Sequence, residues 1–72
     1  DDAKYNALLE QMDKALNGAI APFEKAFEVA EDKDIKLACA EYLKRIYFRF
    51  REKGADYQAN HEKYNKYVEE NK

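Results

Sequence analysis

Apolar and small side chains recur at steps of four and three residues from Tyr5 to Ala30, without a slip. Steps of this size keep side chains on one face of an α-helix, which turns once in about 3.6 residues. The spacing therefore predicts one long amphipathic helix over about 3–31, against which the rest of the chain packs. The members of this stripe are Tyr5, Leu9, Met12, Leu16, Ala19, Phe23, Ala26 and Ala30.

Two signals inside this segment oppose a straight helix. Asn17-Gly18 is a turn-prone pair, and Pro22 lacks an amide hydrogen while its ring crowds the carbonyl of Gly18. A tight turn would have no reason to preserve the apolar spacing, so a kink near Gly18 agrees with both observations. We expect a kinked but continuous helix. The alternative is a break at 17–18, which would give four helices.

Two further helices are expected downstream. Asp34 is the expected N-cap of a second helix over about 34–53, and Gly54 its expected C-cap in the left-handed conformation. The wide apolar arc of this helix is typical of a central helix with neighbours on two sides. A third helix over about 55–70 is rich in tyrosine and completes three antiparallel helices. The arc of the second helix contains Ile35, Cys39, Tyr42, Leu43, Ile46, Tyr47 and Phe50.

Composition supports an all-α fold of a single domain, 1–72. The chain contains no Ser, Thr or Trp and only five β-branched residues, the type on which strands depend. It begins with Asp rather than Met, and we expect it to be a fragment of a longer protein. The sequence leaves its localisation open, since no targeting segment is present in it.

Charge and residue types narrow the range of functions. The 13 basic and 15 acidic residues give a net charge of -2, which argues against a partner that is a nucleic acid or a membrane surface. No apolar run approaches the length of a membrane span. The lack of Ser and Thr excludes the nucleophiles of those types, and one His with one Cys is too few for a structural zinc site. We therefore expect no enzyme and no cofactor, and a buried, inert thiol at Cys39.

Arginine and aromatic residues alternate between Arg45 and Arg51, a pattern that also occurs in nucleic-acid platforms. On a helix, however, this run divides between the packing arc and the opposite side, and the chain has no basic excess. Phe48 with Arg45 and Arg49 is expected to form an exposed patch instead. Aromatic residues and arginines are enriched where proteins contact each other, so these three residues are the candidate protein-contact site.

The spacing Ala19, Phe23, Ala26 resembles the second helix of a tetratricopeptide (TPR) repeat. The segment from Leu43 to Tyr47 is similar to the first helix of the following repeat, with lysine at position 44 where the family has glycine. Glu31-Asp32 stands in place of the usual closing proline. The resemblance covers roughly 17–70, and 3–16 is similar to the elongated last helix of some divergent bacterial TPR proteins. It implies that Ala19, Phe23, Ala26, Leu43 and Tyr47 are repeat-packing residues.

The resemblance further implies TPR-like helical hairpins at the C-terminal end of an array. Such a module would act as a scaffold or adaptor without enzymatic activity, and its partners would be upstream repeats and a protein or peptide. The alternative is a self-contained helical bundle with a structural role, in which the Tyr5–Ala30 stripe pairs with its own copy.

Overall fold

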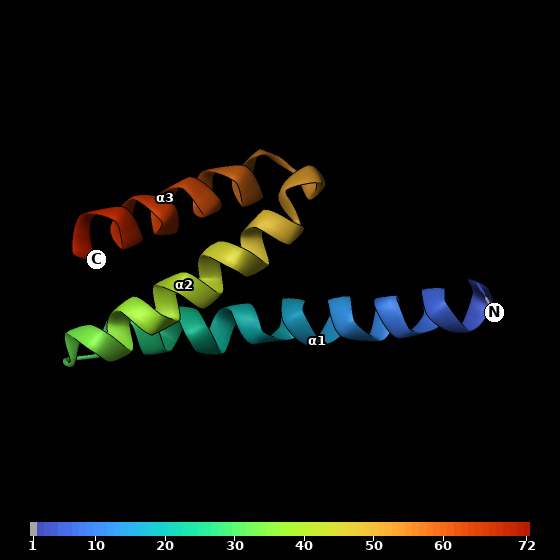
Figure 1. Cartoon of the computed structure of the whole chain (residues 1–72), viewed down its shortest axis with the longest axis horizontal. Helices are drawn as coiled ribbons and strands as arrows, with labels where there is room; N and C mark the ends of the chain where they lie inside the picture. Colours follow the sequence, from blue (N-terminus) through green and yellow to red (C-terminus); the bar gives the residue numbers. More distant parts are fainter. Residues whose placement is uncertain (1) are drawn as a thin grey trace.

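The computed structural model describes residues 2–72, which form three α-helices and one short 3-10 helix. Helix α1 spans Asp2–Val29, α2 spans Lys33–Arg49, the 3-10 helix η1 spans Arg51–Lys53 and α3 spans Ala55–Asn71. The described part of the chain contains no strand, so the predicted all-α class and the count of three helices are confirmed. Helix α2 runs between α1 and α3 (Figure 1).

Helix α1 continues through Gly18 and Pro22, so the four-helix alternative is not realised. The proline is tolerated because Gly18, Ala21 and Pro22 are exposed, and water can satisfy the carbonyl that loses its amide partner. The face toward α2 keeps its apolar side chains. Figure 1 shows α1 as one continuous helix without a sharp bend, in agreement with its bounds of Asp2–Val29.

The start of α2 differs from the prediction by two positions. Asp32, not Asp34, is the N-cap, and its carboxylate accepts hydrogen bonds from the amides of Asp34 at 2.8 Å and Ile35 at 3.2 Å. The prediction of Asp34 was wrong because α1 already ends at Val29 and α2 begins at Lys33, so the residue before the helix is Asp32. Asp34 lies in the first turn instead, where a negative charge favours the helix dipole.

The end of α2 also differs from the prediction. The α-helix stops at Arg49, and η1 occupies the segment expected to be its last turn. Gly54 is not a left-handed C-cap, because its backbone is extended, with φ 164° and ψ 168°. Its carbonyl accepts a hydrogen bond from the amide of Tyr57 at 3.2 Å, so Gly54 is the N-cap of α3. The 3-10 turn η1 reverses the direction of the chain between α2 and α3, so a left-handed glycine is not needed there.

The core lies on α2, as expected for a central helix. Leu43 is fully buried there, and α3 contributes Tyr64 and Val68, whereas α1 has no buried residue. Two members of the predicted α2 arc, Ile35 and Tyr42, are exposed. The complete set of buried apolar residues is Cys39, Ala40, Leu43, Ile46, Tyr47, Phe50, Tyr64 and Val68.

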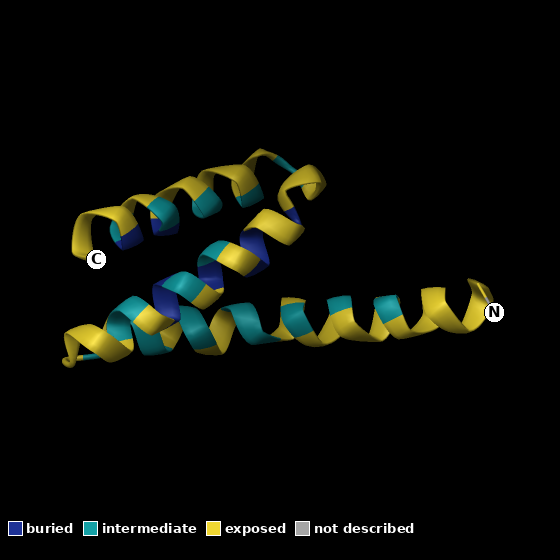
Figure 2. Ribbon diagram, viewed as in Figure 1, coloured by how far each residue is buried: buried dark blue, intermediate teal, exposed yellow. Residues whose placement is uncertain are grey.

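Helix α1 is longer than α2 and α3, which have 17 residues each. Its 28 residues correspond to about 42 Å at about 1.5 Å per residue, close to the 44 Å long dimension of the molecule. Its first turns, residues 2–12, therefore project past α2, and we call this segment the N-terminal arm. Figure 2 shows the arm as mostly exposed. The expectation that the chain packs along the whole stripe was wrong for this half.

Candidate functional site

An apolar groove runs between α1 and α2 on the side of the molecule that α3 does not cover. Phe23 of α1 stacks on Tyr42 of α2 with 5.2 Å between ring centroids and 21° between planes. The groove has a volume of about 390 Å³, and the two arginines at its rim are its only charged lining residues. We call it the α1–α2 groove, and its lining residues are Leu16, Ala19, Phe23, Tyr42, Arg45, Ile46 and Arg49.

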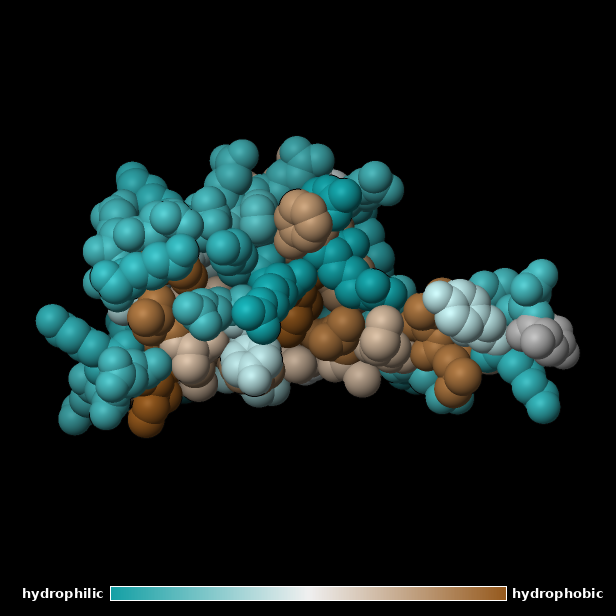
Figure 3. Space-filling model, viewed as in Figure 1, coloured by the Kyte–Doolittle hydropathy of each residue, from teal (hydrophilic) through white to brown (hydrophobic). Residues whose placement is uncertain are grey.

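The N-terminal arm continues the apolar lining of this groove beyond the end of α2. Tyr5 and Leu8 are 63% and 64% exposed, and Met12 is 43% exposed. In Figure 3, brown and tan side chains continue along α1 from its free end to the region where α2 crosses it. Arm and groove therefore form one apolar strip, and no other described segment covers its outer half.

A second exposed surface surrounds Phe48, and Arg45 separates it from the α1–α2 groove. It is 49% exposed, its ring centroid lies 5.1 Å from that of His61, and the Arg51 guanidinium lies 4.0 Å above the ring. With Lys44 and Arg45 these rings border an open cavity of about 360 Å³. The His61 Nδ1 lies 3.0 Å from the Lys44 carbonyl oxygen, which it donates to when protonated. We call this surface the Phe48 patch.

The structure separates the three residues predicted as the protein-contact site. Arg45 lies between the groove and the Phe48 patch and borders both cavities. Arg49 instead donates from Nε to Asp13 of α1 at 2.5 Å. Arg45 and Phe48 are therefore available to a partner in the described structure, whereas Arg49 helps to hold the base of the arm against α2.

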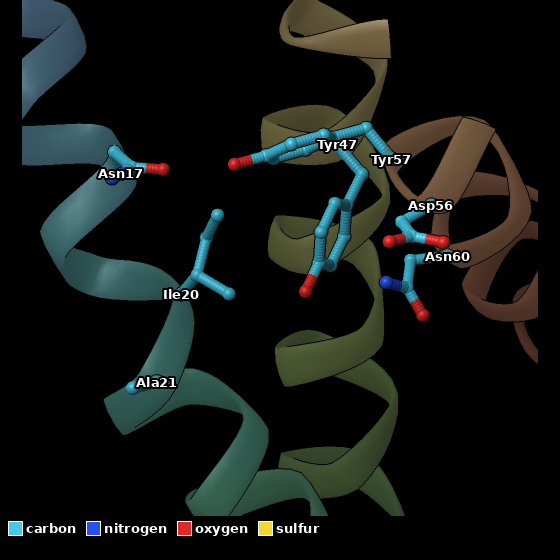
Figure 4. A pocket seen from close by; sticks show the side chains of 7 residues that line it. All are labelled: Asn17, Ile20, Ala21, Tyr47, Asp56, Tyr57 and Asn60. Atoms are coloured by element: carbon cyan, nitrogen blue, oxygen red, sulfur yellow. The ribbon is translucent and has the colours of Figure 1, made fainter. Parts of the chain in front are cut away.

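A third cavity, of about 370 Å³, opens between α1 and α3 beside the middle of α2. Asn17 of α1 points into it, and the hydroxyl ends of Tyr47 and Tyr57 point toward α1 (Figure 4). Asp56 and Asn60 of α3 complete its polar side. Its lining combines these polar side chains with Ile20 and Ala21, so it is more polar than the α1–α2 groove.

One carboxylate joins all three helices, and sequence reasoning missed it. Oε2 of Glu24 on α1 accepts hydrogen bonds from the hydroxyls of Tyr47 on α2 at 2.9 Å and Tyr64 on α3 at 3.1 Å. The two tyrosine rings stack at 5.9 Å. The only signal in the sequence is that Glu24 follows Ile20 by four residues and precedes Phe27 by three, at the edge of the apolar stripe.

Burial and this carboxylate change the acidity of both hydroxyls. Loss of solvation raises the pKa of Tyr64 to about 12, and the charge and hydrogen bond of Glu24 act in the same direction. Burial followed by the hydrogen bond to Glu24 raises the pKa of Tyr47 well above its usual value. Both hydroxyls therefore stay protonated donors to a higher pH than an ordinary tyrosine, which suits a structural cross-link.

The predicted repeat-packing residues differ in burial. Leu43 and Tyr47 are buried in the core, whereas Ala19 and Phe23 line the groove and Ala26 is half-buried on the same face of α1. All five lie on faces where α1 and α2 meet each other or α3. Three of them, Ala19, Phe23 and Ala26, also have surface open to solvent.

The described residues, 2–72, include no group of three or more His, Cys, Asp or Glu side chains that could hold a metal ion. Cys39 is a free, buried cysteine. None of the described helices combines the length and the apolar character of a membrane span. No protein-family model matches this chain, and no curated protein or solved structure does.

Proposed function

We propose that this chain is a TPR-like helical module that binds proteins through its exposed helix faces, as a scaffold or adaptor. The observation that supports this most is the apolar strip formed by the N-terminal arm and the α1–α2 groove. Contiguous apolar surface of this kind is rare on monomeric proteins except where another molecule binds. Tyr5, Leu8 and Met12 expose large side chains on one strip, and this clustering distinguishes them from scattered surface residues.

The groove has the form that suits a helical ligand. A helix laid between two others contacts both walls through side chains three and four residues apart. The walls are held in place, because Phe23 stacks on Tyr42 and the Glu24 carboxylate fixes α1 to α2. A rigid groove loses less conformational entropy on binding than a mobile one.

Positive charge at the rim of the groove favours a ligand helix with acidic residues and fixes its orientation. Arg45 has no ion-pair partner in the described chain and borders both the groove and the Phe48 patch. A ligand with acidic residues beside its apolar stripe would gain an ion pair there. Phe48 next to it offers the exposed aromatic surface that is common at binding hot spots.

Two peptides that share one apolar helical stripe test this function. One carries glutamates beside the stripe and the other lysines, and fluorescence anisotropy reports their binding. We expect the glutamate peptide to bind more tightly, and Arg45→Ala and Phe48→Ala each to weaken it about tenfold, the effect of a hot-spot residue. Lys25→Ala, an exposed change on the other side of α1, is the matched control. If neither peptide binds and the chain does not self-associate, the proposed function is wrong.

A further inference from the structure

We infer that the occupant of the α1–α2 groove is the N-terminal arm of a second copy of this chain, in an antiparallel two-fold dimer through α1. The inference rests on the proposed function, since it names the partner that this surface binds. It follows from three properties of α1: the order of its apolar spacing, the distribution of its charges and the exposure of its arm.

The apolar spacing of the arm is the reverse of the spacing in the groove. Tyr5, Leu9 and Met12 follow one another at steps of four and three, and the groove residues Leu16, Ala19 and Phe23 at steps of three and four. Antiparallel helices therefore match in three successive layers, the geometry of knobs packed into holes. The layers are Tyr5 with Phe23, Leu9 with Ala19, and Met12 with Leu16 of the second copy.

These layers also complement each other in size. Leu9 of the arm meets the small side chain of Ala19, so the two helices can approach closely there. The ring of Tyr5 meets Phe23 at the place where Phe23 already stacks on Tyr42. The two-fold axis passes near position 14, and Ala15, which is exposed and small, lies beside it. This small residue adjoins the layer nearest the axis, Met12 with Leu16, and leaves room for it.

The facing surfaces hold no charge that would repel a second copy. At about 100° per residue, α1 has an arc roughly 140° wide with only apolar side chains between positions 3 and 29. Helix α2 covers one edge of this arc, near Ile20 and Phe27, which are half-buried. The other edge, with Leu8 and Ala15, is exposed. The part of the arc that α2 leaves uncovered can therefore meet its copy without a buried ionic group.

Charges beside the arc favour the same arrangement. Asp13 faces α2 and pairs with Arg49, and Asp2 and Glu10 lie on the same side of α1 by helical spacing. In the antiparallel dimer this acidic side of the arm lies along α2 of the second copy, where Arg45 borders the groove. Opposite charges therefore meet at both symmetry-related rims. This complementarity favours a second copy over a ligand with a basic flank.

A dimer would also provide the arm with the contacts that an isolated helix lacks. Most helical stability in proteins comes from tertiary packing of an amphipathic face, and this packing is largely missing along the arm within one chain. A standard interface buries about 800 Å² per partner. That is roughly one seventh of the 5524 Å² of accessible surface, a share that a strip along the longest helix can supply.

Light scattering on the whole chain over a range of concentrations is the first test. We expect a mass twice the 8.5 kDa of one chain at high concentration, falling to one chain on dilution. Leu9→Glu should shift the dissociation constant upward by about a hundredfold or more. Ala7→Glu, on the opposite and exposed side of α1, should leave it unchanged. Circular dichroism of each variant confirms that the helices remain. A chain that stays a monomer throughout overturns the inference.

Thiol cross-linking tests the antiparallel direction. Ala15→Cys places two thiols beside the axis, so a short bifunctional reagent should trap a covalent dimer. Tyr5→Cys places them about 27 Å apart, from 18 residues at about 1.5 Å each, and should not be trapped. The parent chain is the control for Cys39, which is buried. Trapping of Tyr5→Cys in place of Ala15→Cys indicates parallel helices and overturns the inference.

The two proposals fail in different ways. If the chain is a monomer but the glutamate-flanked peptide binds with the expected Arg45 dependence, the protein-binding function stands and the second copy is not the partner. If neither binding nor self-association occurs, both proposals are wrong. A dimer that the same peptide dissociates shows that arm and peptide occupy one groove.

Discussion

The two halves of α1 carry the same apolar spacing but have different surroundings. Beyond Leu16, the stripe packs on α2, and Glu24 and Phe27 reach α3 through Tyr64. In the arm, Tyr5 and Met12 of the same stripe and the neighbouring Leu8 face solvent. A regular spacing therefore indicates that a face is suited to packing, but it does not tell which helix covers it. The covered half obtains its partner from this chain, and we propose that the other half obtains it from a second copy.

Truncation of one leucine in each region gives the largest expected difference between them. Leu43 is 0% exposed and Leu8 is 64% exposed. Leu43→Ala should lower the free energy of unfolding by about 2–5 kcal/mol, because it leaves a cavity in the core. Leu8→Ala should change it by less than about 0.5 kcal/mol in the monomer. Urea unfolding at a chain concentration below dimerisation measures both.

Equal effects of the two truncations would contradict the comparison. They would mean that the arm is as well packed within one chain as the core on α2. A loss of stability in Leu8→Ala that appears only at high chain concentration would instead support the comparison. Mass action then couples stability to dimer formation.

Alkaline pH acts on the packed half through the Glu24 cross-link. Tyrosine ionises near pH 10 in an unfolded chain, and the pKa of Tyr64 is raised to about 12 in the folded one. Its contribution to stability is thus complete below about pH 10 and is lost as the pH rises through about 12. Across this range the free energy of unfolding of the parent should fall by about 2 kcal/mol more than that of Tyr64→Phe. Denaturant unfolding at each pH measures both.

A tyrosine in the other half provides the control for this pH effect. Tyr5 is 63% exposed, and Tyr5→Phe should leave the dependence of stability on pH as it is in the parent. A profile of Tyr64→Phe that is identical to that of the parent would show that the Tyr64 hydroxyl does not contribute.

The smallest expected effect is at the start of α2, beside the packed end of α1. Asp32→Ala removes the acceptor for two amides and should cost about 1 kcal/mol, seen as a lower Tm. Asp34→Ala removes only a favourable charge in the first turn and should cost a few tenths. A larger loss of stability in Asp34→Ala than in Asp32→Ala would indicate that Asp34 is the N-cap, as the sequence predicted.

Local patterns predicted the helices better than their ends. The spacing of apolar residues and the lack of β-branched types were sufficient for three helices and a central α2. The cap at Asp32 and the 3-10 turn before Gly54 depend on how the helices meet, which spacing does not describe. Asp32 and Asp34 are equally good caps by residue type, and the tertiary structure selects between them.

The candidate site was predicted only in part, for a similar reason. Phe48 and Arg45 follow from helical spacing, since both fall outside the packing arc. The pairing of Arg49 with Asp13 joins positions 36 residues apart, and the meeting of Glu24 with Tyr64 joins positions 40 apart. Such pairs depend on the angle between helices. The groove itself was not predicted, because its two walls come from α1 and α2 and depend on how these helices cross.

Because α1 continues through Pro22 without a break, its free end moves as a rigid extension of its packed end. From Glu24, where α1 is fixed to α2 and α3, to Asp2 is a distance of about 33 Å along the helix. A tilt of about 10° at that fulcrum moves the free end by about 6 Å, more than half the usual distance between packed helices. The core residues around Glu24 therefore set where the far end of the molecule is presented, and a small change among them would alter the geometry of any assembly built through the arm.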